Sequence, residues 1–402
     1  MFSLDQFISK YVTKRPASMF KPDIDANREI LTQKIKGKSV LVIGGAGSIG
    51  SSFIKALLPF RPSVLVVVDT NENALAELTR DLRSTKGMYI PDDYLPYPMD
   101  FASPVFEKMF RRRGGFDIVG NFSAHKHVRS EKDIYSVEAL LHNNVLHAKL
   151  LLELLSEYPP EEYFCVSTDK AANPVNIMGA SKRIMEDVIF SYSDKFPVKT
   201  ARFANVAFSN GSLPAGFLAR IQKLQPLSAP SDVRRYFVSP EESGQICLLS
   251  CILGENRAIF FPKLEEAQMM TFDAIGKELL KAHGYEVLEC GSDEEAIDKA
   301  EELKNGSDLY PVHFAVSDTS GEKSFEEFVT DTETVDMDRF SSLGVITGKQ
   351  IPDKNRVDTL FRDLSEAFDK DTTTKEEVIA ILKEYLPNFE HIETGRSLDS
   401  KM

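Results

Sequence analysis

The chain has 402 residues, of which 42% are hydrophobic and 27% are charged. These proportions are those of an ordinary folded protein and exclude disordered, collagen-like and coiled-coil chains. The 61 Asp and Glu outnumber the 48 Lys and Arg, which gives a net charge of −13. We therefore expect no nonspecific binding to nucleic acid or to an anionic membrane.

Cysteine usage and the N-terminus predict a soluble protein of a reducing compartment. The four cysteines form no C-x-x-C pair and are too scattered for a disulfide framework or a zinc site; they are Cys165, Cys247, Cys251 and Cys290. No run reaches the roughly 18 apolar residues of a membrane span. Residues 1–14 lack the apolar core of a signal peptide. We expect a cytoplasmic protein with no membrane segment and no metal.

The first 36 residues predict a helical arm, because apolar side chains recur there at helical spacing. Short apolar, β-branched runs then alternate with helical periods. These runs, which predict buried strands, fall at residues 39–43, 64–68, 97–99, 118–122, 163–166 and 198–203. Strands separated by helices build a parallel sheet with right-handed crossovers. We predict an α/β fold, with a doubly wound, Rossmann-type domain over residues 37–205.

The alternation weakens after residue 205, which is typical of a smaller lobe, and we assign residues 206–335 to a substrate-binding lobe. Its expected elements are helices at 215–223, 240–253 and 272–283 and strands at 258–261 and 312–316. Residues 286–333 contain 15 Asp or Glu against 3 Lys, which indicates a solvated acidic insertion. Residues 336–402 form a tail with two amphipathic helical periods between Arg356 and Leu386.

A glycine-rich turn directly follows the first strand of the predicted domain. Gly44, Gly47 and Gly50 have the spacing G-x-x-G-x-x-G, and Ser48 and Ile49 open the next helix. Glycine lets a phosphate approach the backbone, and the helix N-terminus supplies N–H donors and positive potential. The alternative is a tight turn of purely structural origin. The position of the turn between a strand and a helix favours dinucleotide binding.

Three further strand ends are expected to line the same site. Asp69 ends the second strand, where its carboxylate can accept hydrogen bonds from ribose hydroxyls. That carboxylate repels a 2′-phosphate, which favours NAD over NADP, although a distant cation leaves NADP open. Asp100 and Phe101 follow the third strand and fit either the adenine edge or the start of a helix. We also assign Ser123 and Ala124, after the fourth strand, to the cofactor site.

The strand at 163–166 ends in a second polar group. Ser167, Thr168, Asp169 and Lys170 follow the strand, and the segment Met178-Gly179-Ala180-Ser181-Lys182 opens a later helix. Ligands of such sheets bind beyond the carboxyl ends of the strands, so these side chains should face the nicotinamide. A nucleotide-sugar short-chain dehydrogenase has Tyr-x-x-x-Lys at the helix. This chain has Met178 in the position of that Tyr.

Several motifs together resemble the UDP-N-acetylglucosamine 4,6-dehydratase family of extended short-chain dehydrogenases, which supplies sugars for bacterial surface glycans. The resemblance covers residues 36–330, and some members of that family carry Met in place of Tyr. Its motifs are Ala124-His125-Lys126-His127-Val128, Thr168-Asp169-Lys170-Ala171, Asn173-Pro174, Met178 to Lys182, Arg202 to Val206, Ser209 to Ser212, Arg235-Tyr236-Phe237 and Gly321-Glu322-Lys323 with Glu326-Glu327. Ala204 stands where the family has Gly, and the acidic insertion and the tail lie outside the resemblance.

The resemblance implies oxidation at sugar C4, loss of water across C5 and C6, and return of the hydride to C6. By analogy, Asp169 is the acid and Lys170 the base of the elimination, which requires a dry pocket. Lys182 would contact the nicotinamide ribose, and Thr168 would lie near sugar O4. A thioether accepts no proton, so Met178 would pack against the ligands. The alternative for Asp169 and Lys170 is a surface salt bridge.

The diphosphate and uridine of a UDP-sugar need cations and hydrogen-bond donors. The resemblance offers Lys126, Arg202, Asn205 and Arg235. Arg202 lies in a predicted strand, where it can equally pair with a carboxylate. His125 and His127 have no third partner in view and are not expected to bind metal.

Two rival functions remain open from the sequence. A UDP-sugar 4-epimerase or reductase needs the glycine turn and Lys182 but no acid-base pair, whereas a noncatalytic NAD(P)-binding regulator would tolerate the missing Tyr. Helices 137–158 and 178–193 carry apolar residues on more than one side, which predicts either a homo-oligomer through these helices or their burial within one chain.

Overall fold

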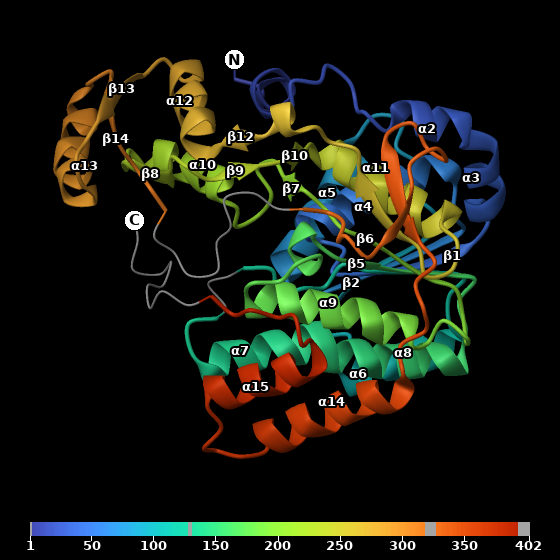
Figure 1. Ribbon diagram of the computed structural model, residues 1–402. Coiled ribbons are helices and arrows are strands. Elements are labelled where there is room, and N and C mark those ends of the chain that lie inside the picture. The colour runs from blue at the N-terminus through green and yellow to red at the C-terminus, as the bar shows by residue number, and fades with distance from the viewer. Residues whose placement is uncertain (1, 128–130, 318–326, 393–402) are drawn as a thin grey trace.

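The computed structural model describes residues 2–127, 131–317 and 327–392 (Figure 1). Its main sheet has the strand order β15-β16-β11-β6-β5-β4-β1-β2-β3. All neighbours from β3 to β11 pair in parallel, whereas β16 and β15 pair antiparallel. The strands are β1 Ser39–Ile43, β2 Val64–Asp69, β3 Asp93–Pro98, β4 Ile118–Asn121, β5 Glu162–Val166, β6 Val198–Ala201, β11 Ile259–Pro262, β15 Thr334–Asp336 and β16 Leu343–Thr347. The predicted doubly wound, Rossmann-type α/β fold is confirmed.

The strand order reverses between β1 and β4, because the chain first adds β2 and β3 on one side and then β4, β5 and β6 on the other. Loops leave the sheet in opposite directions at such a point and leave a crevice at the carboxyl ends of the strands. The register places Ile43 opposite Asn121 and Asn121 opposite Cys165. The segments that follow β1, β4 and β5 therefore emerge side by side.

Two layers of helices cover the sheet, and the strands alternate between them. Val40 and Val42 of β1 belong to the core that contains α4, α5 and α11, whereas Leu41 and Ile43 belong to the core that contains α6 to α9. This alternation follows from the period of two along a strand. The first set is α4 Ser48–Leu57, α5 Glu72–Ser84 and α11 Pro240–Leu253, and the second is α6 Pro104–Arg113, α7 Ile134–Leu141, α8 His147–Glu157 and α9 Ile177–Phe190.

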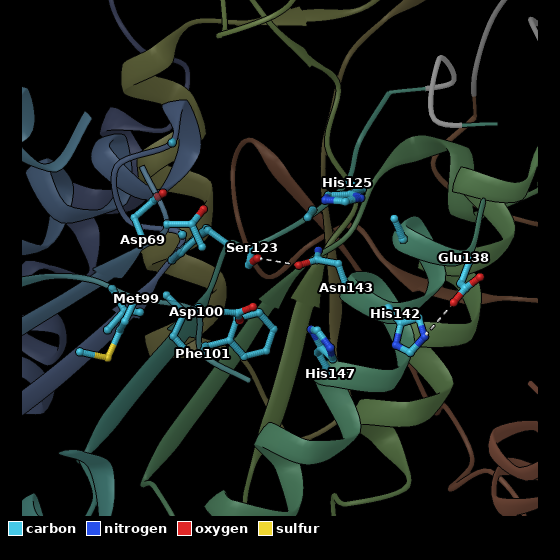
Figure 2. A pocket seen from close by; sticks show the side chains of 18 of the residues that line it. Asp69, Met99, Asp100, Phe101, Ser123, His125, Glu138, His142, Asn143 and His147 are labelled. Atoms are coloured by element: carbon cyan, nitrogen blue, oxygen red, sulfur yellow. Dashed lines mark hydrogen bonds and ion pairs between the residues drawn. The ribbon is translucent and has the colours of Figure 1, made fainter. Parts of the chain in front are cut away.

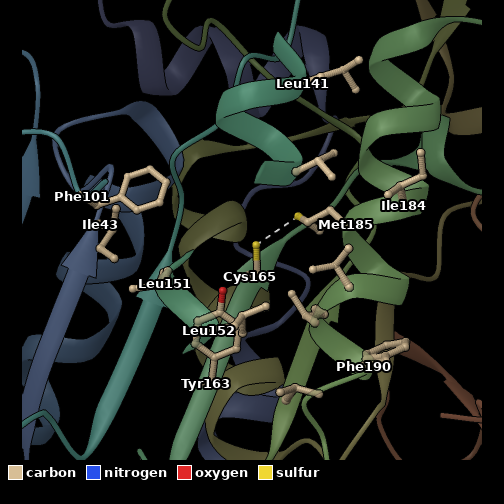
Figure 3. Close-up of a cluster of buried hydrophobic side chains, with 14 of the residues drawn as sticks. Ile43, Phe101, Leu141, Leu151, Leu152, Tyr163, Cys165, Ile184, Met185 and Phe190 are labelled. Atoms are coloured by element: carbon tan, nitrogen blue, oxygen red, sulfur yellow. Dashed lines mark hydrogen bonds between the residues drawn. The ribbon is translucent and has the colours of Figure 1, made fainter. Parts of the chain in front are cut away.

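Figure 3 shows the second core between β5 and α9. The Cys165 thiol faces the Met185 sulfur at 3.1 Å in this layer. All four cysteines are free and buried. Burial raises the pKa of the Cys165 thiol, which keeps it protonated.

A smaller lobe lies over one end of the sheet, as predicted, but not all of residues 206–335 belong to it. The helix α11 packs on α4, and β11 pairs with β6, so both return to the main sheet. The lobe itself contains β7 Asn205–Val206, α10 Leu213–Lys223, β8 Leu227–Pro230, β9 Arg234–Arg235, β10 Phe237–Val238, β12 Met270–Thr271, α12 Phe272–Ala282, β13 Glu286–Glu289, α13 Asp293–Ala300 and β14 Leu309–Ala315.

The acidic insertion is folded where the structure describes it. Strand β13, helix α13 and strand β14 form one β-α-β unit. The central strand β14 pairs in parallel with β13 on one side and with β8 on the other, in a three-stranded sheet. Tyr310 and Val312 of β14 are fully buried, whereas Leu309 at its start is 44% exposed. The acidic side chains occupy the outside of this unit, so the insertion extends the smaller lobe.

The N-terminal arm joins the two parts of the molecule. Helix α1 (Leu4–Phe7) and the π-helical turn Ile8–Val12 pack into the core of the smaller lobe. Helices α2 (Lys21–Ala26) and α3 (Arg28–Ile35) pack against α11 instead. Between them, Arg15 makes two hydrogen bonds of 2.7 Å to the buried carboxylate of Glu242, at the start of α11.

The tail differs from its prediction, because it begins with two strands before its helices. Strands β15 and β16 extend the main sheet, and α14 (Lys354–Phe368) and α15 (Lys375–Tyr385) then form an outer layer against α7, α8 and α9 (Figure 1). The Phe368 ring lies 5.4 Å from the His142 ring, and the Tyr385 hydroxyl bonds Asp187 at 3.5 Å.

These tail helices answer part of the question about the apolar helix faces. The residues that predicted either oligomerisation or burial are covered within this chain, with the exception of Leu150, which is 53% exposed. The covered residues are Leu140, Leu141, Val145, Leu151, Ile184, Val188 and Ile189. Burial inside one chain therefore accounts for these side chains, and an oligomer stays a prediction that needs another surface.

Candidate active site

The glycine-rich turn lies at the crevice between β1 and β4. Gly44 has φ of +68°, and a Cβ there would lie 2.6 Å from the backbone nitrogen of Ser123. A Cβ on Gly50 would lie 2.4 Å from the Gly44 carbonyl oxygen. Glycine is therefore required at the first position for the turn and at the third for close packing of α4 on the turn. Gly47 precedes α4, whose first turn has no side-chain cap.

Ser48 and Ile49 begin α4 and connect the turn to its surroundings. The Ser48 hydroxyl accepts a hydrogen bond from the backbone N–H of Asn210 at 2.8 Å, which ties the turn to the smaller lobe. The Ile49 side chain packs against the core on both faces of the sheet.

Asp69 stands at the end of β2 and orders the turn. One of its carboxylate oxygens accepts from the N–H of Ala46 at 3.0 Å, and the other accepts from the N–H of Asn71 at 2.9 Å. A carboxylate has about four lone-pair sites, so acceptor capacity remains for ribose hydroxyls.

A cavity of about 700 Å³ extends from this turn across the ends of the strands (Figure 2). Its lining contains most of the residues predicted to bind the cofactor: Gly44, Gly47, Asp69, Asp100, Phe101, Ser123 and Ala124. Phe101 is buried and its ring meets the His147 ring edge to face at 6.0 Å. The Asp100 carboxylate accepts from the N–H of Ala102 at 2.9 Å, while Ser103 is the residue that caps α6. The alternative role of Asp100 as the helix cap is therefore wrong.

The sequence did not single out the polar residues on the opposite wall of the cavity. Ser123 donates its hydroxyl hydrogen to the Asn143 side-chain oxygen at 3.2 Å (Figure 2). The Asn144 side chain holds the loop after β4. It accepts a hydrogen bond from the N–H of His125 and donates one to the carbonyl of His125, both at 2.9 Å. The same side chain donates to the Ser181 hydroxyl at 3.0 Å, and Ser181 lies in α9. Adjacent asparagines inside an apolar helix were the signal for this connection.

The predicted catalytic pair lies at the end of β5 and is not turned toward bulk solvent. The Asp169 side chain is 4% exposed and that of Lys170 is 18% exposed. Oδ1 of Asp169 accepts from the Lys170 ammonium at 3.1 Å, from the Lys170 N–H at 2.9 Å and from the Thr168 hydroxyl at 2.8 Å. The two side chains form an ion pair that is largely shielded on its Asp169 side, and its catalytic role stays a prediction. These residues follow β5, next to the cavity-lining segments that follow β4 and β1.

Met178 and Lys182 lie on successive turns of α9, and both are 3% exposed. The Lys182 ammonium donates to the Val166 carbonyl at 3.1 Å, at the end of β5. Burial lowers the pKa of Lys182, while the nearby Cys165 and Glu186 act in the opposite direction. Burial lowers the pKa of His125, which lines the cavity, and the positive charge of Lys182 lowers it further. Lys182 thus lies close to the end of β5 and near His125 of the cavity lining.

Arg202 does not face a ligand, which corrects its assignment to the substrate. Its guanidinium is 0% exposed and bonds the Glu186 carboxylate at 2.8 and 2.9 Å, the Glu333 carboxylate at 2.7 and 2.9 Å, and the Phe328 carbonyl. Burial raises the pKa of Glu333, but Arg202 and Lys349 outweigh burial and hold it at about 2. The alternative, a pair with a carboxylate, is the observed one.

The other three substrate candidates occupy different settings. Asn205, in β7, has a buried side-chain nitrogen for which no acceptor exists among the described residues. Arg235, in β9, is 4% exposed and donates to the Arg234 carbonyl at 3.0 Å. Lys126 lies on the exposed loop after β4. An amide without an acceptor is the kind of group that a ligand satisfies.

Some expectations fall on residues that the structure does not describe. Val128 and the segment Gly321 to Glu326 lie outside the described residues, whereas Glu327 bonds Asn173 at 3.0 Å. Across residues 2–127, 131–317 and 327–392 there is no cluster of metal-binding side chains. In the same part of the chain no helix has both the length and the apolar character needed to cross a membrane.

The sheet order, the glycine turn and the polar strand ends define a Rossmann-type α/β protein with a nucleotide-type crevice. Residues 40–347 match the family described as polysaccharide biosynthesis protein, and the chain belongs to this family.

Several curated proteins are similar to this chain in sequence. A Methanocaldococcus jannaschii protein described as an uncharacterized membrane protein is 27% identical over 87% of this chain and 96% of its own length. A Staphylococcus aureus capsular polysaccharide biosynthesis protein is 27% identical over 72% of this chain, which spans about half of that protein (48%). A Campylobacter jejuni UDP-N-acetylglucosamine 4,6-dehydratase (inverting) is 25% identical over 57% of this chain and 67% of its own.

Solved structures share the fold. Pen from Bacillus thuringiensis superposes with a TM-score of 0.63 at 18% identity, over 82% of this chain and 98% of that one. A Streptomyces venezuelae dTDP-glucose 4,6-dehydratase, a double mutant with NAD bound, gives a TM-score of 0.51 at 18% identity, over 69% of this chain and 88% of that one.

Proposed function

We propose that the protein is an NAD-dependent nucleotide-sugar 4,6-dehydratase that acts on UDP-N-acetylglucosamine. The observation that carries the proposal is the shielded Asp169-Lys170 pair at the end of β5, next to the strand ends that line the cavity. An epimerase or a simple reductase has no use for such a pair. The relative from Campylobacter jejuni that bears this activity in its name supports the choice of sugar.

The described residues fit a dinucleotide. A Cβ on Gly44 would collide with the backbone of Phe122 and Ser123, so glycine lets the turn lie close to the loop after β4. The first turn of α4 has no side-chain cap, and Asp69 retains acceptor capacity toward a ribose. The carboxylate of Asp69 favours NAD, because a 2′-phosphate would meet it as a like charge. When bound, NAD supplies the oxidation at sugar C4 and the return of the hydride.

The paired side chains can supply both proton transfers of the elimination. Moving one proton from the Lys170 ammonium to Asp169, across a contact of 3.1 Å, converts a charged pair into a neutral acid and a neutral amine. A dry setting favours this exchange, because low polarity disfavours separate charges. Lys170 then takes the proton from C5, and Asp169 protonates the departing C6 hydroxyl. The Thr168 hydroxyl, held by Asp169, would lie near sugar O4.

Lys182 and Asn205 would orient the ligands. The Lys182 ammonium is fixed at the end of β5 and has donor hydrogens beyond the one given to Val166, which suits a nicotinamide ribose. The Asn205 amide and Arg235 would meet the diphosphate or uridine, as the resemblance implies, and Lys126 is the more exposed candidate. Met178 has no proton-accepting group and would serve as packing.

The test is product mass with UDP-N-acetylglucosamine and NAD for the wild-type protein and for Lys170→Gln. The wild-type product should be lighter by one water, and Lys170→Gln should abolish this product while NAD affinity stays within about twofold. The chain offers a matched control in Lys195→Gln, since Asp194 and Lys195 are also neighbours but are 57% and 56% exposed. Water loss that survives Lys170→Gln would contradict the proposal.

Neither rival function predicts loss of water in the same experiment. A 4-epimerase returns a sugar of unchanged mass, and a noncatalytic NAD-binding regulator returns the substrate itself. A cytoplasmic location and a role in surface glycan synthesis remain predictions that accompany the proposed activity.

A further inference from the structure

After α15, its last helix, the chain returns to α9, the helix that carries Met178 and Lys182. Tyr385, at the end of α15, bonds Asp187 in the C-terminal half of α9, and the chain then reaches the start of α9 at Ile392. Phe389 is 2% exposed and belongs to the core under α9. The N–H of Ile392 donates to the Val175 carbonyl at 3.0 Å, two residues before α9 begins. This segment lies beyond the residues that match the family.

A buried carboxylate caps the same end of α9. Glu131 accepts from the N–H of Ile177 at 3.0 Å and from the N–H of Met178 at 2.8 Å. The Asn176 side chain accepts from the N–H of Gly179 at 2.8 Å, so the first turn has acceptors for three successive amides. Glu131 is 7% exposed. A negative group at a helix N-terminus is stabilised by the helix dipole.

The C-terminal segment supplies the partner of this carboxylate. Nε2 of His391 lies 3.6 Å from Oε2 of Glu131, and each side chain is 8% exposed. The Phe389 ring packs against the imidazole at a centroid distance of 6.0 Å. His391 therefore faces the Glu131 oxygen that accepts from the N–H of Ile177.

We propose that Glu131 and His391 are positioning residues, through which the C-terminal segment clamps the first turn of α9. Met178 lies in that turn and Lys182 lies one turn later. The clamp therefore determines the position of both side chains along the helix axis, beside the end of β5. The consequence for turnover rests on the proposed function. The clamp itself does not, because it is a set of contacts within the chain.

Replacement of His391 by Leu tests the clamp, because Leu keeps the bulk and removes both ring nitrogens. Loss of this partner leaves Glu131 without its neighbour and loosens the first turn of α9. We expect the backbone amides of Ile177 and Met178 to exchange with solvent about tenfold faster by hydrogen-exchange mass spectrometry. We expect kcat to fall about tenfold while NAD affinity and KM change less than about twofold.

His391→Gln is the conservative comparison, since an amide nitrogen can still reach the carboxylate of Glu131. This variant should restore most of the slow amide exchange and most of kcat. Glu390→Gln alters the exposed neighbour and serves as the matched control. Should His391→Leu fail to fold, Ile392→Pro carries the same test, because it removes the N–H that bonds the Val175 carbonyl and leaves His391 in the sequence.

If the amides of Ile177 and Met178 exchange in His391→Leu at the wild-type rate, the proposed clamp is wrong. Faster exchange with unchanged kcat overturns its catalytic role, and so does an equal loss in Glu390→Gln. If the wild-type protein does not dehydrate UDP-N-acetylglucosamine, the proposed function fails, and the exchange rates of Ile177 and Met178 still decide whether the clamp exists.

Discussion

Replacement of Arg202 by Met separates a structural role for this residue from a role in substrate binding. Met keeps most of the side-chain volume but removes the guanidinium, which has no exposed surface. Glu186, also 0% exposed, then keeps the Ser167 hydroxyl at 2.8 Å and Arg183 at 3.8 Å. Glu333 keeps Lys349. Two carboxylates thus lose their main partner in the interior of the protein.

The loss of folding free energy in Arg202→Met follows from two buried carboxylates that no longer have their cationic partner. Removing one side of a buried ion pair typically destabilises a protein by about 3–5 kcal/mol. For a chain of this size, we expect the thermal midpoint to fall by about 5 °C or more. The double variant Arg202→Met/Glu186→Gln should be more stable than Arg202→Met alone, because neutral Gln can still accept from Ser167.

Thermal and urea unfolding of the single and double variants measure this coupling, and UDP binding is measured in parallel. Arg80→Met is the matched control: its pair with Glu77 is exposed, and its loss should cost less than about 1 kcal/mol. Wild-type stability of Arg202→Met together with weakened UDP binding would refute the structural role and restore the original assignment.

Three further predictions concern the cofactor and the buried charges. Gly44→Ala should weaken NAD binding more than about tenfold by fluorescence titration, whereas Gly87→Ala, whose φ is also positive but whose Cβ would meet no atom within 4 Å, should leave NAD binding unchanged; equal losses would contradict close approach at the turn. Asp69→Asn should narrow the preference for NAD over NADP in the same titration, and an unchanged ratio would exclude charge as its source. The folded-state pKa of Glu333 is about 2 and its ordinary value is 4.5, so its contribution of about 3 kcal/mol is present above pH 4.5 and lost as the pH falls toward 2. Glu333→Gln should therefore flatten the pH dependence of unfolding in this range, and an unaltered slope would contradict the assigned pKa.

The parallel strands were predictable because burial on both faces gives continuous apolar runs. β1 begins and ends as predicted, and β2, β4 and β5 differ by one residue at an end. β3 was misplaced at residues 97–99, because its sequence at Asp93–Pro98 mixes proline and polar residues at the edge of the sheet. β16 was missed, since a single short apolar run does not reveal that it pairs with β11.

The site was predictable where chemistry requires particular residues next to a strand end. Gly44 and Asp69 needed no knowledge of tertiary contacts. The partner of Arg202 was not readable, because Glu186 and Glu333 come from separate elements. The packing of the tail on α9 could not be predicted for the same reason. The apolar face of a helix indicates that the face is buried, but it does not show which segment covers it.

The claim on which the account depends is that Lys170 removes the C5 proton of an oxidised sugar. Conversion of UDP-N-acetylglucosamine in heavy water, followed by mass spectrometry and NMR of the product, measures this step directly. The account predicts a product that has lost one water and carries deuterium at C5, and neither change with Lys170→Gln. A sugar of unchanged mass from the wild-type protein, or C5 deuterium that persists in Lys170→Gln, would contradict it.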